Sequence, residues 1–369
     1  MKTRIAFNAA LAAWPLAFVS PTQVHAQSSV TLYGSLDAGL GYVSNLHSSN
    51  AFIAQQDTFQ ADRFGMLSTE EDIGAGRTVL FRLESDFATM TGASASSSTF
   101  FNRQAYVGLA NPRFGTLTLG RQTDWNFDWL GSLSTGQMLG DFSAFHPSNL
   151  DGLGNTLLVQ LSNTVKWKSA TWCGFSAGAL YGFLGAAASN TNGRTISFGA
   201  NYANGPLKLV AVYSEYRDRL LPLSTGLGLT AFEGQTLAAG VTFNAKQVRD
   251  MGVGASYCFE RVTLHALATD VRIQSSGGVE HFRAYDGGAN VRLSPAEEIS
   301  AGAWTATLTG RRWTQLTVAN VYSLSKSTQL YADVMFETAG GGAMANTLGI
   351  GASSGGRQTV ILSDIHHLF

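Results

Sequence analysis

One stretch of the chain concentrates carboxylates without any cation to balance them. Residues 124–155 contain Asp124, Asp128, Asp141 and Asp151 and no Lys or Arg. The segment runs for 32 residues without the alternation of a strand, and connections of that length are usually functional. Fixed charges of one sign that lie close together create a local electric field. The sequence therefore predicts an acidic functional loop.

Two other patterns could carry a different chemistry. Gly174–Gly178 satisfies the G-x-S-x-G pattern of a hydrolase nucleophile elbow, which needs a strand, a sharp turn and a helix. Here it lies in an alternating segment that continues to Tyr181, so the small residues of a strand explain it better. His366 and His367, beside Asp364, point to opposite faces of a strand and cannot chelate one ion together. We expect no catalytic residue, metal or cofactor.

The two cysteines also fit no redox or metal site. Two thiols in 369 residues cannot form a disulfide framework or a four-thiolate site. By strand count, Cys173 falls on the seventh strand and Cys258 on the tenth. These strands are not neighbours, so a bridge within a Cα separation of about 7 Å is not expected. We expect free thiols.

The elements that position these residues belong to an exported protein. Only 13% of the residues are charged, against about 25% in soluble proteins. Residues 1–26 resemble a cleaved signal peptide, with Lys2 and Arg4 before an apolar stretch and Val24–Ala26 at the cleavage site. Residues 27–369 form one predicted domain with 22 basic and 25 acidic residues, a net charge of −3. This charge gives no reason to expect nucleic acid as a partner.

Alternating apolar and polar residues indicate β-strands throughout this domain. From Val30 to Tyr42, and again from Val79 to Phe87, one face of the segment is apolar and the other polar. Arg82 shares its face with Glu84 and Asp86 and so should point to water. No apolar run after residue 26 is long enough for a membrane-spanning helix. About sixteen such segments predict a sandwich or a barrel, and export with scarce charge favours a membrane barrel.

The lengths of the connections support the barrel. Short links alternate with long ones, as in outer-membrane barrels with tight periplasmic turns and long external loops. The short links are Glu71–Gly76, Asn111–Gly115, Ala203–Pro206 and Ser325–Thr328. The long links are Ser44–Thr58, Thr91–Thr99, Asp124–Asn155, Arg219–Gln247 and Gly340–Gly355. An extra alternating stretch, Thr236–Gln247, predicts that the fourth of these long links is partly β-structured.

Ordered fragments across nearly the whole domain resemble the general porins of Gram-negative bacteria. They are Ser29–Gly34, Asp37–Gly39, Arg63–Gly65, Glu71–Gly74, Phe81–Ser85, Asn102–Leu109, Phe114–Gln122, Asn163–Trp167, Tyr202–Leu207, Gly254–Tyr257 and Tyr322–Lys326. The chain also ends in Phe369, as these porins do. The resemblance implies an all-β, transmembrane antiparallel barrel of sixteen strands whose third external loop folds inward. It also implies export to the outer membrane, a homotrimer in the lipid bilayer, and recognition of the C-terminal strand by the barrel-assembly machinery.

The resemblance further implies where the charges of the pore lie. Residues 124–155 would be the inward loop, so that Asp124, Asp128, Asp141 and Asp151 face a basic wall. Arg63, Arg103 and Lys166 match basic positions of the family on the second, fourth and sixth strands. Arg82 and Arg121 complete the predicted cluster. Such a constriction would bias the flux of solutes without trapping them.

Three functions remain open on the sequence. The main hypothesis is a general diffusion porin that passes ions and small hydrophilic solutes passively. A substrate-specific channel differs from it only in loop chemistry. A barrel hydrolase is a more remote alternative, because no Ser-His-acid grouping is visible in the sequence. The sequence leaves the preference for anions or cations undecided, since the mature chain is slightly negative while the predicted arginines favour anions.

Overall fold

The computed structural model describes residues 29–70, 73–183, 194–238 and 240–369. The predicted signal peptide, residues 1–26, lies outside the described residues, so its cleavage site stays a prediction.

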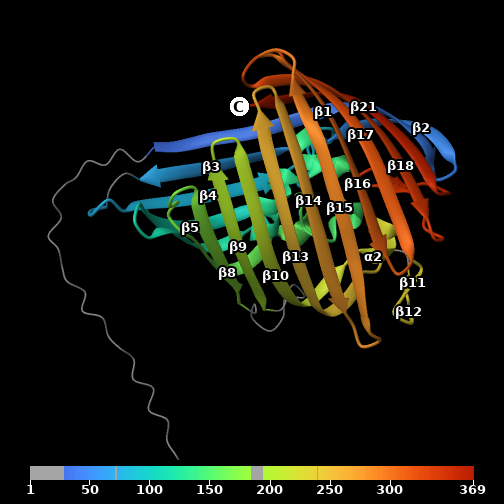
Figure 1. The fold of residues 1–369 in the computed structure, drawn as a ribbon, viewed down its shortest axis with the longest axis horizontal. Helices are drawn as coiled ribbons and strands as arrows, with labels where there is room; N and C mark the ends of the chain where they lie inside the picture. Colours follow the sequence, from blue (N-terminus) through green and yellow to red (C-terminus); the bar gives the residue numbers. More distant parts are fainter. Residues whose placement is uncertain (1–28, 71–72, 184–193, 239) are drawn as a thin grey trace, which may run out of the picture.

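Within the described residues, seventeen strands form one antiparallel sheet that closes into a barrel (Figure 1). They are β1 Ser29–Leu46, β2 Ser49–Gln56, β3 Arg63–Glu70, β4 Thr78–Asp86, β5 Gln104–Asn111, β6 Gly115–Gln122, β7 Leu161–Lys168, β8 Phe175–Gly182, β9 Thr195–Asn204, β10 Leu207–Leu221, β13 Phe243–Phe259, β14 Val262–Gln274, β15 Val279–Arg292, β16 Glu297–Leu308, β17 Arg311–Ser323, β18 Thr328–Gly340 and β21 Arg357–Leu368. Both β2 and β3 pair with β1 and together act as one strand of the barrel wall. The barrel therefore has sixteen strands, as predicted.

The first and last strands close the barrel. β1 pairs with β21 from Ser35–Leu368 to Val43–Val360, and Figure 1 shows the two side by side. Beyond this ladder, the backbone N–H of Gly34 donates to the carbonyl of Phe369 at 3.0 Å, and the N–H of Phe369 donates back at 3.1 Å. The Phe369 ring also lies where a Cβ on Gly34 would be, so the terminal residue fits only against glycine.

Most connections confirm the asymmetry of the two barrel rims, although the rim opposite the C-terminus also holds short turns at residues 275–278 and 309–310. Short turns at residues 112–114, 205–206, 260–261 and 324–327 lie at the rim that carries the C-terminus. Longer connections at 87–103, 123–160, 222–242 and 341–356 lie at the opposite rim. The predicted long link Ser44–Thr58 was wrong, because β1 and β2 join through His47 and Ser48 alone. The irregular backbone lies instead at residues 57–62, where the Asp37 carboxylate accepts backbone N–H groups of Phe59 and Gln60.

Residues 123–160, here called loop 3, form a chain of short helices inside the barrel. These are η1 Asn126–Leu130, η2 Gly131–Leu133, α1 Thr135–Leu139, η3 Phe142–Ala144, η4 Pro147–Asn149 and η5 Leu157–Val159. Two other connections hold α2 Leu223–Leu227, β11 Ala231–Phe232, β12 Gln235–Thr236, β19 Asn346–Thr347 and β20 Gly351–Ala352. The link does hold β-structure, but the β11–β12 hairpin precedes most of the predicted stretch Thr236–Gln247, whose residues 243–247 belong to barrel strand β13. In the described part of the chain, no helix is long and apolar enough to cross a membrane.

Glycines on the inner wall let loop 3 lie flat against it. A Cβ added at Gly199 on β9 would approach Trp129 to 2.5 Å, and one at Gly252 on β13 would approach Leu130 to 2.2 Å. A Cβ added at Gly302 on β16 would likewise approach the Thr135 side chain to 2.5 Å. Real Cβ atoms do not come so close to other heavy atoms. The positions of these three glycines therefore fix the path of the loop along one side of the barrel.

The interior of the barrel is wet on one side and packed on the other. The polar face of each predicted strand was expected to point into the barrel and meet water. In β10 and β13–β17, however, the halves near the rim opposite the C-terminus turn apolar residues inward. Phe282, Trp304 and Trp313, each 3% exposed or less, belong to one cluster with residues of the connection 222–242. The Trp304 indole donates to the Ala144 carbonyl of loop 3 at 2.9 Å. Alternation predicts which face a residue occupies, but not whether a loop will cover that face.

Candidate functional site: a basic cavity beside loop 3

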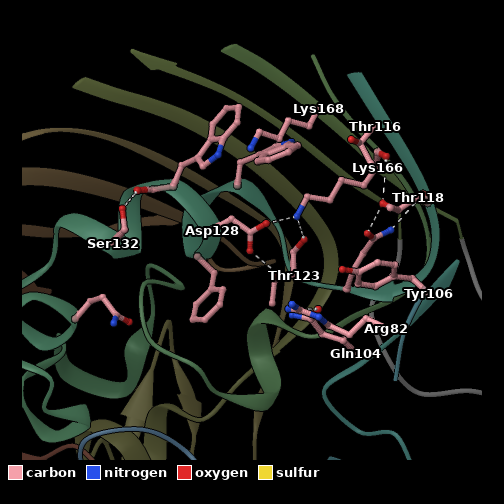
Figure 2. Close-up of a pocket in the computed structure, with 15 residues that line it drawn as sticks. Arg82, Gln104, Tyr106, Thr116, Thr118, Thr123, Asp128, Ser132, Lys166 and Lys168 are labelled. Atoms are coloured by element: carbon pink, nitrogen blue, oxygen red, sulfur yellow. Dashed lines mark hydrogen bonds and ion pairs between the residues drawn. The ribbon is translucent and has the colours of Figure 1, made fainter. Parts of the chain in front are cut away.

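The open side of the barrel holds a cavity of about 580 Å³ between loop 3 and the wall formed by β4–β7 (Figure 2). We call it the basic cavity. Its lining is Arg82, Gln104, Tyr106, Thr116, Thr118, Gln122, Lys166 and Lys168 from the wall, and Thr123, Trp125, Phe127, Asp128, Trp129, Ser132 and Gln137 from loop 3. Strand register places these wall residues together: Arg82 is opposite Tyr106, Thr118 opposite Lys166, and Thr116 opposite Lys168.

Cations outnumber carboxylates in this cavity. Lys166 binds Asp128 in an ion pair and donates to the Thr123 carbonyl at 2.7 Å, as Figure 2 shows. Among the described residues, no carboxylate lies within ion-pair distance of Arg82 or Lys168. Arg82 donates only to the neutral Gln104 amide, at 3.4 Å. With three cations and one carboxylate, the basic cavity carries a formal charge of +2.

Arg63 and Arg103 lie next to the basic cavity in a tighter network. The Arg103 guanidinium donates to Glu84 at 2.5 Å and to Asp86 at 2.8 Å, and Arg63 is 3.7 Å from Glu84. The Arg103 side chain is only 5% exposed. Both arginines line a space of about 90 Å³ that shares Phe127 and Gln137 with the basic cavity. The structure thus pairs both predicted wall arginines with carboxylates of β4, a pairing that the sequence analysis did not predict.

Arg121 lies away from these groups. Its Nε donates to the Asn102 carbonyl at 2.8 Å and its Nη1 to the Ser162 hydroxyl at 2.7 Å. On β6 it has the parity of the exposed, lipid-facing Leu117 and Leu119. The structure therefore does not bring Arg121 into the predicted basic cluster.

Three of the four loop carboxylates are buried away from the basic cavity, which corrects the expected acidic face. Asp124 accepts a hydrogen bond from the Tyr216 hydroxyl and one from the backbone N–H of Phe127 at 3.2 Å. Asp141 is 1% exposed and caps η3 by accepting from the Ser143 N–H at 2.7 Å. Burial raises the pKa of both carboxyl groups. Of the four, only Asp128 borders the basic cavity.

The fourth carboxylate, Asp151, belongs to a clamp that the sequence did not indicate. His146 Nδ1 lies 2.6 Å from Asp151, and its Nε2 lies 3.2 Å from Asp286 on β15. Asp151 also accepts from Thr269 of β14 at 2.8 Å, and all three groups of the clamp are fully buried. Burial alone lowers the pKa of His146, but the two carboxylates outweigh this and raise the pKa to about 10. The clamp is therefore a buried cation between two anions, and it ties loop 3 to the wall.

Lys168 is the wall cation that the sequence analysis missed. It is two residues beyond Lys166 on β7 and so shares its inward face. That parity could have identified it. The aromatic lining of the basic cavity had no such signal, because the position of Phe127 depends on how loop 3 packs.

The remaining sequence patterns occupy ordinary positions in the wall. Ser176 of the G-x-S-x-G pattern lies on β8, which pairs antiparallel with β7 and β9 rather than turning into a helix. Cys173 and Cys258 are both free and exposed, as expected. Cys173 lies in the turn before β8, not on the seventh barrel strand itself.

A closed sixteen-stranded barrel with an exposed apolar exterior and a charged inner cavity defines a membrane-spanning β-barrel channel. A family model for Gram-negative porins matches residues 9–342. The chain belongs to this Gram-negative porin family, whose members are outer-membrane channels and not enzymes.

Individual relatives agree with the family. An outer membrane porin protein of Bordetella pertussis is 29% identical over 365 residues, which cover 83% of this chain and 88% of that protein. Outer membrane porin protein 32 of Delftia acidovorans is 26% identical over 368 residues, with 93% and 95% covered. Among solved structures, the anion-selective porin from Comamonas acidovorans has a TM-score of 0.76 at 23% identity, covering 93% of this chain and 100% of that chain. The protein is therefore placed in the Gram-negative outer membrane.

Proposed function

We propose that the protein is a general diffusion channel that prefers small anions among hydrophilic solutes. The observation that supports this most is the formal charge of +2 in the basic cavity, where Arg82 and Lys168 have no paired carboxylate among the described residues. The proposed constriction lies where Arg63 and Arg103 approach Phe127 and Gln137 of loop 3. A solute would pass this narrow space and the basic cavity in succession.

The magnitude of the electrostatic effect suits a channel. Two unit charges 4 Å apart interact by about 1 kcal/mol in water and by about 4 kcal/mol at an effective dielectric constant of 20. Each 1.4 kcal/mol corresponds to about a tenfold change in a partition ratio. Two unpaired cations can thus enrich anions several-fold without holding them, and conduction requires such weak binding.

A porin of similar fold, from Comamonas acidovorans, is anion-selective. The same property in this chain rests on its own cations.

The reversal potential in a salt gradient tests the proposal. We expect the refolded protein in a planar bilayer with a KCl gradient to give a reversal potential of the sign set by chloride. A potential of the sign set by potassium would contradict the proposed anion preference. Swelling of porin-containing liposomes in small neutral sugars, with a rate that falls as solute size grows, would separate general diffusion from a specific channel.

We also propose that the mature chain starts at residue 27 and assembles as a homotrimer, with β21 recognised by the barrel-assembly machinery. OmpT of Vibrio cholerae, with a similar fold at a TM-score of 0.65, has been solved in a trimer form. In this chain Phe369 completes the β1–β21 junction through its backbone and its ring. We expect unheated wild-type protein to migrate as a trimer in electrophoresis and Phe369→Ala to yield less of it. A wild-type protein that migrates as a monomer would rule out the trimer. An unchanged trimer yield in Phe369→Ala would rule out the role of Phe369.

A further inference from the structure

The basic cavity contains an aromatic surface that a purely ionic filter does not need. Phe127 of loop 3 is half-buried, lines both the basic cavity and the smaller space beside it, and makes no ring–ring contact with another described aromatic residue. Tyr106, also half-buried, lines the same cavity from β5 and is next to Arg82 in the strand register. Porin interiors are generally polar, so accessible rings beside unpaired cations require an explanation.

Packing explains the other two rings but not these. Trp125 and Trp129 lie with ring centroids 4.2 Å apart, and the glycines at 178 and 199 of the wall leave room for them. They are at most 7% exposed and hold loop 3 in place. Phe127 belongs to none of the described apolar clusters. Its ring therefore remains available to a solute in the cavity.

We propose that the basic cavity binds small aromatic carboxylates, anions of the benzoate type, during their passage. The carboxylate would bind Arg82, and the ring would lie against Phe127 and Tyr106, while Lys168 adds positive charge farther along the wall. Lys166 is not the anchor, because Asp128 and the Thr123 carbonyl already bind its ammonium group. This inference rests on the proposed anion channel and names the solute class that it favours.

The lining suits such a ligand in both size and chemistry. A volume of about 580 Å³ exceeds that of one substituted benzene ring and leaves water beside it. The hydroxyls of Thr116 and Ser132, together with the Gln137 amide, supply neutral hydrogen-bonding groups around the cations. The Arg82 guanidinium itself lies 5.7 Å from the Tyr33 ring centroid, an aromatic contact that helps to position it on the wall. Among the described lining residues, Asp128 is the sole carboxylate, and its pairing with Lys166 limits its repulsion of the ligand.

Inhibition of the chloride current by organic acids tests the proposal. We would add benzoate, cyclohexanecarboxylate or acetate to the wild-type pore in a planar bilayer and measure the concentration that halves the chloride current. Benzoate and cyclohexanecarboxylate have the same charge and a similar size, so their ratio isolates the aromatic ring. We expect benzoate to act at a concentration about threefold to tenfold lower, the range of an aromatic contact.

Three variants locate the effect. Phe127→Leu is expected to bring the benzoate to cyclohexanecarboxylate ratio close to one, while Phe127→Tyr retains the preference. Phe114→Leu removes an exposed ring from the turn between β5 and β6, outside the cavity, and should leave the ratio unchanged. Because the readout compares two anions in the same pore, a general loss of folded protein does not change it.

The outcomes separate this inference from the proposed function. Equal inhibition of the wild type by the two acids would overturn the aromatic site even in an anion-selective pore. Retention of the benzoate preference by Phe127→Leu would also overturn it. A wild-type reversal potential of the potassium sign would instead refute the anion channel itself.

Discussion

Exchanging both Arg82 and Lys168 for glutamate is expected to reverse the ion selectivity of the pore. The formal charge of the basic cavity would change from +2 to −2, because each substitution replaces one positive charge with one negative charge. At about 1 kcal/mol or more per charge pair at short range, the ratio of anion to cation permeability should fall by at least about tenfold. The measurement is the reversal potential in a KCl gradient, which should change sign.

A matched variant controls for the total charge of the protein. Arg113→Glu combined with Lys326→Glu makes the same change in net charge, at exposed turns of the short-turn rim and outside the basic cavity. We expect this control to leave the sign of the reversal potential as in the wild type. If both double variants shifted selectivity equally, the field of the whole molecule and not the cavity would set it.

Substituting His146 by leucine is expected to release loop 3 from the wall. The change leaves Asp151 and Asp286 buried without the cation between them. Removing one partner of a buried ion pair typically costs about 3–5 kcal/mol. We expect new protease cleavage within residues 124–155 of the folded barrel and larger noise in the single-channel current.

Alkaline pH should weaken the same clamp without any substitution. Because the pKa of His146 is raised to about 10 in the folded protein, the clamp is fully formed below the ordinary histidine pKa of about 6.5. Its contribution declines as the pH rises and is lost above about 10. Current noise in the wild type should therefore grow with pH, whereas His146→Leu should be noisy throughout.

His281→Leu provides the control for the clamp. His281 also pairs with an aspartate, Asp270, at 2.7 Å, but its side chain is 38% exposed on the outer face of the barrel. Exposed pairs contribute about 1 kcal/mol or less. We expect this variant to keep loop 3 protected from protease. A protected loop in His146→Leu as well would show that the glycine wall alone suffices to hold it.

The barrel could be predicted from the sequence because its signals are local. The alternation from Val30 to Tyr42 corresponds to β1, and the parity of Arg82 placed it correctly on the inner face. Where local composition was misleading, the prediction was wrong. The Ser- and Asn-containing residues 44–58 suggested a loop, yet pairing with β1 makes most of them strand β2.

The orientation of groups in loop 3 could not be predicted in the same way. Asp128 and Asp124 are four residues apart in one acidic segment, but one borders the cavity and the other is buried against Tyr216. What separates them is the packing of the segment against glycines on distant strands, such as Gly252. Composition indicates the kind of charge on a loop, whereas tertiary contacts decide which charges meet the pore.

The uneven interior has a consequence for how this protein can change over generations. The apolar cluster around Phe282, Trp304 and Trp313 lies on one side of the interior, whereas the wall of β4–β7 lines the basic cavity. Residues such as Thr116 and Lys168 can therefore be exchanged with little effect on folding. Substitutions in the wall of β4–β7 can therefore alter which solutes the cell takes up, while the packed side of the barrel keeps its structure.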